Sequence, residues 1–214
     1  MKRVFAIMMG LMLIVSSGCS QPQTESRPLS EKEIQTVNEA FEPLLPANEG
    51  DMLVMTSSEG EFTLNPISHF FTSYYDKPEN LDVGKFVYYI PRETFVTAED
   101  EKELEKLREL EWLPFDNIDN SSVPFGRIPF ATVEQYLQKY MNVPLDDMTN
   151  MGDALYLEEY ETFYSYASDF GPGSFHCTRG EINGDIVTLY SENAVLTLKK
   201  DDANYYIISH VSIE

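Results

Sequence analysis

Cysteine, tryptophan, histidine and basic residues are all scarce in this chain. Its 214 residues include two cysteines, one tryptophan and three histidines, and only 15 Lys and Arg stand against 36 Asp and Glu. The formal net charge of −21 argues against a nucleic-acid partner, because that binding depends on Lys and Arg that neutralise phosphates. His69, His176 and His210 are too few and too scattered to indicate a transition-metal site.

A long hydrophobic run is also missing. After Lys2 and Arg3, the run from Val4 to Val15 is apolar except for Gly10, but it has only 12 residues. A membrane-spanning helix needs about 20 apolar residues, so this run is too short to cross a bilayer comfortably. A charged start, a short apolar middle and small residues afterwards are typical of a secretory signal.

The segment Ser16-Ser17-Gly18-Cys19 follows that run and resembles a bacterial lipobox. The resemblance implies that residues 1–18 form a lipoprotein signal peptide, and that the Cys19 thiol carries a diacylglyceryl group and becomes the first mature residue. Two acyl chains suffice for a stable anchor, so the resemblance implies an extracytoplasmic, lipid-anchored location on a bacterial cell membrane. The alternative is an ordinary cleaved signal in which Cys19 is incidental.

The remaining chain divides into a tether and one domain. Residues 19–29 are polar with two prolines and predict a flexible tether, and residues 30–214 have the length of a single acidic domain. Removal of residues 1–18 takes away Lys2 and Arg3 and brings the formal net charge from −21 to −23. That charge opposes contact with an anionic membrane, so we expect the domain to stand off the surface.

Helices are expected mainly in the first two thirds of the domain. Ser30 and Glu33 form a capping-box pattern ahead of a helix that ends before Pro43. Asn65-Pro66 predicts the start of a short helical segment. Further helices are predicted from the apolar spacing, with Thr97 and Thr132 as caps of the second and third: residues 83–90, 98–111 and 132–141. A hairpin is expected from residues 51–56 and 61–64.

Strands are expected at the C-terminal end. Residues 155–168 fit a helix or a strand, and their second half favours an extended form. Four strands are then predicted from an apolar period of two: residues 174–182, 186–191, 194–200 and 205–213. Asn183-Gly184 indicates a tight hairpin with positive φ at both residues, and Ile186 and Tyr190 are expected on the buried face. The fold class is therefore α+β, with N-terminal helices packed on a C-terminal four-stranded antiparallel meander.

Catalytic and cofactor motifs are not found. The sequence contains no G-x-S-x-G, H-E-x-x-H, C-x-x-C or phosphate-binding glycine loop. His176 and Cys177 are neighbours on an expected strand and would point to opposite faces, so Cys177 is expected in the core. We predict no catalytic residue, no metal and no cofactor. Calcium is a weak alternative at two acidic groups that lack the EF-hand spacing: Asp116, Asp119 and Asn120, and Asp146, Asp147 and Asp153.

A ligand patch is predicted at Tyr160, Tyr164, Tyr166 and Asp169, where rings could stack on a sugar or a side chain and the carboxylate could orient it. The function favoured by these observations is a non-catalytic binding module whose partner is an envelope protein, a peptide or a glycan. The alternative is a glycosidase-like extracellular hydrolase with paired carboxylates, Glu158 or Glu159 together with Asp169. A third possibility is a structural role in assembly, which a large apolar patch would indicate.

Several longer stretches carry a second resemblance. They are "FFTSYY" (70–75), "LEEYETFY" (157–164), "SDFGPGSF" (168–175) and "GEINGDIVTLY" (180–190). With them the chain resembles surface lipoproteins of Gram-positive, clostridial type whose function is not known. This resemblance implies a cell-surface location and no particular activity.

Overall fold

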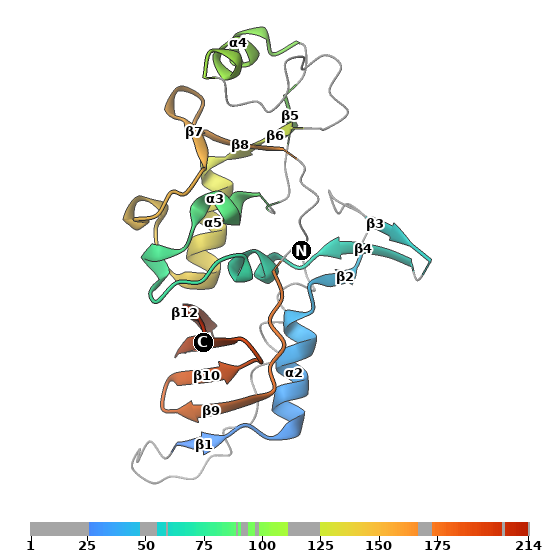
Figure 1. The fold of residues 1–214 in the computed structure, drawn as a ribbon, viewed down its shortest axis with the longest axis vertical. Helices are drawn as coiled ribbons and strands as arrows, with labels where there is room; N and C mark the ends of the chain where they lie inside the picture. The colour runs from blue at the N-terminus through green and yellow to red at the C-terminus, as the bar shows by residue number, and fades with distance from the viewer. Residues whose placement is uncertain are drawn as a thin grey trace.

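The structure is a computed structural model that describes residues 26–47, 55–58, 60–88, 90, 94–96, 99–110, 125–166, 173–202 and 204–213. It has a mixed α/β fold with three antiparallel sheets (Figure 1). The α-helices in these ranges are α2 (Glu31–Phe41), α3 (Val83–Val87), α4 (Glu101–Glu109) and α5 (Phe130–Met141). Short 3-10 helices are η1 (Pro66–Phe71), η2 (Pro78–Asn80), η4 (Leu145–Asp147) and η5 (Glu158–Tyr160).

The largest sheet has five strands in the order β1-β9-β10-β11-β12. Its strands are β1 (Arg27–Pro28), β9 (Arg179–Asn183), β10 (Ile186–Tyr190), β11 (Ala194–Asp201) and β12 (Asn204–Ser212). The sheet differs from the expected four-stranded meander because β1 pairs with β9 at its edge. The amide of Leu29 also donates to the carbonyl of Gly180 at 2.8 Å, so residues 27–29, expected in the tether, are bonded to the edge of β9.

The first C-terminal strand begins later than expected. The apolar period predicts it from residue 174, but β9 starts at Arg179. Ahead of β9, the amide of Cys177 donates to Oδ1 of Asn38 on α2 at 2.7 Å. A side chain of α2 therefore takes the place of a neighbouring strand in this segment.

The turn after β9 uses different residues from those predicted. Asn183 pairs with Ile186, so the two loop residues are Gly184 and Asp185. Gly184 has φ 65°, whereas Asn183 and Asp185 do not have positive φ. Glycine at the first loop position is typical of a type II′ turn, in which only that residue needs positive φ.

Helix α2 begins as the sequence predicts. Ser30 Oγ accepts from the Glu33 amide and the Glu33 carboxylate accepts from the Ser30 amide, which confirms the capping box. Val37 and Phe41 are the buried residues of this helix and face the core. The polar start and the apolar stripe together fix both the position and the rotation of α2.

Several helix boundaries differ from the predictions. Asn65 caps η1 as expected, with its side chain accepting from the amide of Ile67. Helix α3 ends at Val87, short of the predicted residue 90, and α4 begins at Glu101 after Asp100. Thr97 and Ala98 lie outside the described residues. Helix α5 starts at Phe130 after Pro129 in place of Thr132, because the strand before it leads directly into the helix.

The ambiguous segment 155–166 forms two strands around one short helix. These are β7 (Leu155–Leu157), η5 and β8 (Thr162–Tyr166), which confirms the extended form of its second half. With β5 (Thr94–Phe95) and β6 (Phe125–Pro129) they make a four-stranded sheet in the order β5-β6-β8-β7. The third sheet, β2-β4-β3, contains β2 (Leu44–Pro46), β3 (Met55–Ser57) and β4 (Gly60–Leu64), so β3 and β4 form the expected hairpin within the described part of 51–64.

The molecule is elongated, with the five-stranded sheet at one end and α4 beside the four-stranded sheet at the other (Figure 1). Helix α5 lies between them, and the β3–β4 hairpin projects to the side. One large apolar core joins α2, η1, α3 and α5 to one face of the five-stranded sheet. A smaller cluster lies under α4: Val96, Leu104, Leu107, Leu157 and Tyr164.

Candidate binding surface

The predicted tyrosine patch does not form an open site in the described residues. Tyr164 lies in β8 and is only 2% exposed, and Tyr160 at the end of η5 packs half-buried against the small cluster. The backbone of Tyr166 belongs to β8, and Asp169 lies outside the described residues. Tyr164 is therefore a core residue, which removes it as a stacking surface for a ligand.

Tyr164 instead takes part in a buried polar network that the sequence did not predict. Its hydroxyl donates to Oε1 of Glu103 on α4 at 2.5 Å, and Nε of Arg127 on β6 donates to the same oxygen at 2.7 Å. Nη2 of Arg127 contacts the second oxygen of Glu103 and also Asp100 Oδ1 at 2.7 Å. The carboxylate of Glu103, in a residue that is only 7% exposed, is thus held by three donors.

The chemistry of this network is that of a fixed ion pair. Burial and the hydrogen bond to Glu103 raise the pKa of Tyr164, and the hydrogen bond to Glu103 raises the pKa of Arg127. Both groups therefore keep their protons across the physiological range. Because Glu103 accepts from both, the network attaches α4 to β6 and β8.

Of the carboxylates predicted as a hydrolytic pair, the structure describes Glu158 and Glu159. The side chains of Glu158 and Glu159, on η5, are exposed, and Glu161 after them has φ 47° and is exposed as well. Their possible partner, Asp169, lies outside the described residues.

The Cys177 thiol donates to the carbonyl of Arg179, and the three imidazoles lie in different surroundings. Cys177 is buried, with its pKa raised by burial, whereas its neighbour His176 is exposed, as their alternation predicted. His69 lies fully inside the core against the rings of Phe86 and Tyr136, and burial lowers its pKa to about 3. His210 is buried too, with Nδ1 2.8 Å from the Ser73 carbonyl and a pKa lowered by burial.

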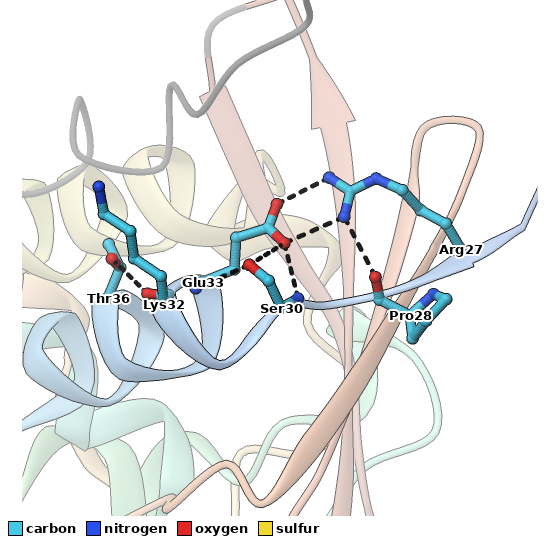
Figure 2. Close-up of polar contacts among 6 residues, drawn as sticks. All are labelled: Arg27, Pro28, Ser30, Lys32, Glu33 and Thr36. Carbon is cyan, nitrogen blue, oxygen red and sulfur yellow. Dashed lines mark hydrogen bonds and ion pairs between the residues drawn. The ribbon is translucent and has the colours of Figure 1, made fainter.

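The N-terminal end of the described chain is fastened to the domain by a polar clamp (Figure 2). Arg27 on β1 points toward Glu33 on α2, and its two terminal nitrogens donate to the two carboxylate oxygens at 3.0 and 2.7 Å. Arg27 also donates to the Pro28 carbonyl at 3.1 Å. The hydrogen bonds from Arg27 lower the pKa of Glu33 to about 2, so the pair stays ionised over the whole physiological range.

The five-stranded sheet presents a second face that is not part of the core. On β10, Val187 and Leu189 are buried, while Ile186, Thr188 and Tyr190 alternate with them and are only half-buried. The expectation that Ile186 and Tyr190 face the core is therefore wrong, because a shift of one residue sends every side chain of a strand to the opposite face. We call the face that carries these three residues the outer face.

Side chains of the outer face lie in three rows across β9, β10, β11 and β12. Cross-strand pairing sets them out as follows: Arg179, Tyr190, Val195 and Val211; Glu181, Thr188, Thr197 and Ser209; Asn183, Ile186, Lys199 and Tyr206. All twelve are exposed or half-buried. The middle row has hydrogen-bonding side chains only, and the two rows beside it mix rings, aliphatic groups and charges.

One end of the outer face is organised before any ligand arrives. The Arg179 guanidinium lies over the Tyr190 ring at 3.6 Å from its centroid, and the Tyr190 hydroxyl donates to Glu181 at 3.0 Å. That hydrogen bond raises the pKa of Tyr190. Three side chains of neighbouring strands thus hold one another in place. These side chains would therefore lose less conformational entropy when a ligand binds.

The edge strands of this sheet are β1 and β12. At one edge, β1 and the Leu29 amide occupy β9. At the other, Tyr75 and His210 exchange backbone hydrogen bonds at 2.6 and 2.9 Å beside β12. In the described residues this bridge involves one of the nine residues of β12, so the outer face and the edge of β12 are both surfaces at which this sheet can meet a partner.

Comparison with known proteins gives no match to any family model, curated protein or solved structure. In the ranges that the structure describes, no helix has the length and apolar character of a bilayer crossing. The same ranges contain no group of three His, Cys, Asp or Glu side chains arranged to hold a metal.

Proposed function

We propose that the protein is a lipid-anchored, extracytoplasmic binding module that carries acyl chains on Cys19 and presents the outer face to a ligand in the cell envelope. The lipobox-like segment supports the anchor, and the composition supports a module that binds without nucleic acid. The acidic domain remains on the aqueous side, joined to the membrane by residues 20–26.

The observation that carries this proposal is the clamp at the start of the domain. Arg27 and Leu29 fasten β1 to Glu33 and to the edge of β9, so the tether ends at a fixed point on the five-stranded sheet. From Cys19 to Arg27 the chain spans at most about 30 Å when fully extended. With acyl chains on Cys19, the clamp would therefore hold one end of the sheet, including its outer face, within a short distance of the membrane.

Binding is favoured over catalysis by the state of the titratable groups. The buried histidines are kept neutral, the buried thiol is kept protonated, and Glu103 is held by three donors. An active site needs groups that converge on one point and can change protonation there. The outer face instead offers fixed hydrogen-bonding and ring surfaces, which suit recognition.

A Cys19→Ala substitution in the full chain tests the anchor. We expect the native protein to enter the detergent phase of a Triton X-114 extraction of the cells, and the variant to lose its acyl group and leave that phase. The matched control is Cys177→Ala, which changes the other cysteine, a buried residue of the core, and should leave the partition unchanged. Native protein that stays in the aqueous phase, or is recovered from the cytosol, contradicts the proposal.

A further inference from the structure

The hairpin between β9 and β10 contains the one Asn-Gly sequence of the chain, Asn183-Gly184. Asn183 is the last residue of β9 and pairs with Ile186, so Gly184 and Asp185 form the two-residue loop. All three residues from 183 to 185 are exposed. Water and dissolved base therefore reach both the side-chain amide of Asn183 and the backbone that follows it.

An asparagine side chain can react with its own backbone when the next residue leaves its nitrogen accessible. After base removes the proton from the Gly184 backbone nitrogen, that nitrogen can attack Cγ of Asn183. The bond from Cγ to the side-chain nitrogen then breaks, and this nitrogen takes a proton from water and leaves as ammonia. A five-membered succinimide ring remains. Glycine favours the attack because it has no Cβ, so its backbone can approach another group closely.

Water then opens the succinimide at one of its two carbonyl carbons. Opening at Cγ gives an aspartate with an ordinary backbone at position 183. Opening at the main-chain carbonyl gives an isoaspartate, in which the chain continues to Gly184 through Cγ and one additional CH₂ lies in the backbone. Both products replace an amide with a carboxylate, which takes the formal net charge of the chain from −21 to −22.

The end of this hairpin can open without unfolding the sheet. The attack needs a rotation of the extended backbone of Asn183, and the pair of Asn183 with Ile186 opposes that rotation. This pair is the last of its ladder, and exposed loops and fraying ends open at the lowest free energies in a protein. Gly184 already has φ 65° and tolerates a wide range of backbone angles. Within the described residues, no hydrogen bond involves its amide.

The turn between β10 and β11 provides a comparison inside the same molecule. Asn193 is exposed like Asn183, but the next residue is Ala194, which is buried. The Ala194 amide, which would have to attack, donates to Ser191 Oγ at 2.9 Å. The carbonyl of Asn193 accepts from the Ile213 amide at 2.9 Å. A Cβ and two hydrogen bonds therefore oppose at Asn193 the reaction that the turn at Asn183 permits.

We propose that Asn183 is a site of spontaneous deamidation, at which base and water convert the Asn183-Gly184 turn through a succinimide into aspartate and isoaspartate. The additional CH₂ of the isoaspartate lengthens a turn that has two loop residues, so this product loosens the pair with Ile186. The aspartate keeps the ordinary backbone and leaves the pair in place. The site depends neither on the lipid anchor nor on a ligand of the outer face.

Peptide mass spectrometry of the full chain, kept in detergent micelles at pH 6 and at pH 8, tests this assignment. Trypsin cleaves after Arg179 and Lys199, so one peptide, residues 180–199, contains both Asn183 and Asn193. Because glycine leaves its nitrogen accessible and alanine does not, we expect Asn183 to change from amide to acid on the order of tenfold faster than Asn193. The reaction should be faster at pH 8 than at pH 6, because base removes the proton from the attacking nitrogen.

Two variants separate the chemistry from its effect on the turn. Asn183→Gln cannot form the five-membered ring and should keep its amide. Asn183→Asp is the matched control, since it carries the new charge on an ordinary backbone. Electron-transfer fragmentation measures the isoaspartate, and hydrogen exchange at Ile186 should rise with it in the native chain and stay low in Asn183→Asp.

Three results would overturn the proposal. They are an Asn183 that reacts no faster than Asn193, a reaction that occurs in urea and not in the folded chain, and a product without isoaspartate. Unchanged exchange at Ile186 in a chain rich in isoaspartate would overturn the loosening of the turn. Because the reaction needs no acyl chain, its failure is distinct from a failure of the Cys19 test.

Discussion

The two ends of the molecule are stabilised by different interactions. At the end with the five-stranded sheet, fully buried aliphatic residues such as Leu189 and Leu196 belong to a core that extends through α2, α3 and α5. At the other end, α4 rests on a small apolar cluster and on the buried pair of Glu103 and Arg127. The first end carries the clamp and the outer face, and the second carries neither.

This difference determines how each end of the molecule should unfold. A core that is continuous over several elements transmits a defect to all of them, so its loss should appear as global unfolding. A helix held by a small apolar cluster and one ion-paired network can separate while the remaining fold stays intact, as a local opening. The proposed binding surface therefore lies on the more rigid end, where its rows of side chains keep their spacing.

The largest expected effect comes from a cavity in the continuous core. Leu196→Ala removes a fully buried side chain from β11 and should lower the free energy of unfolding by about 3–5 kcal/mol. Urea denaturation of the full chain measures it. The comparison with the other end is Leu107→Ala on α4, which should raise hydrogen exchange mainly in α4 and leave the exchange of β9 to β12 unchanged. Equal exchange in both regions would show that the two ends unfold together.

Breaking the buried ion pair should have the next largest effect. Glu103→Ala leaves Arg127 without its main partner and should lower the free energy of unfolding by about 2–3 kcal/mol. The loss is smaller than for a fully buried pair because the Arg127 side chain is 23% exposed. Amide exchange should increase in α4. Glu109→Ala on the exposed side of the same helix is the matched control and should cost less than about 0.5 kcal/mol. A double variant, Glu103→Met/Arg127→Met, that is as unstable as Glu103→Ala would rule out the charge as the cause.

Acid should destabilise the core through His69. Its pKa is about 3 when folded and 6.5 for an exposed histidine side chain, so below pH 6.5 the unfolded chain binds a proton that the folded chain does not. Stability from this group is thus complete above pH 6.5 and decreases as the pH falls toward 3, by about 2 kcal/mol at pH 5. His69→Phe keeps an aromatic ring beside Phe86 and removes the titration. Denaturation curves at pH 7 and 5 should show that the variant loses less unfolding free energy than the native chain between these two pH values. Identical losses in both proteins would contradict this role of His69.

The smallest effect is expected at the clamp. Ser30→Ala removes one side of the capping box and should cost about 1 kcal/mol. Arg27→Ala should cost less, since the Arg27 side chain is 47% exposed and its ion pair is screened by water. Thermal melts in low and high salt separate the contribution of the cap from that of the ion pair, because only the ion pair weakens with salt. A salt-dependent effect of Ser30→Ala would show that the cap acts through charge and not through its hydroxyl.

Local chemistry explains which parts of the fold the sequence predicts. The capping box at Ser30, the cap at Asn65 and the end of α5 at Met141 each depend on a few adjacent residues, and the structure confirms all three. Alternation also placed His176 and Cys177 correctly.

Contacts between distant segments explain what the sequence does not reveal. Tyr164 and Glu103 are 61 positions apart, and Arg127 is 24 from Glu103, so no local pattern shows that they meet. Strand β1 forms because β9 offers a free edge. The sequence of residues 27–29 alone does not show that this edge is there. The outer row of Glu181, Thr188, Thr197 and Ser209 follows from the alternation only when Val187 and Leu189 are taken as the buried residues of β10.

The claim that the domain is held at a membrane is tested most directly by the mass of its N-terminal peptide. Native protein is extracted from the producing cells, digested and measured by mass spectrometry. The account predicts a mature chain that starts at Cys19 and carries a diacylglyceryl group on the thiol. A chain that starts elsewhere, or a Cys19 without an acyl group, would contradict it.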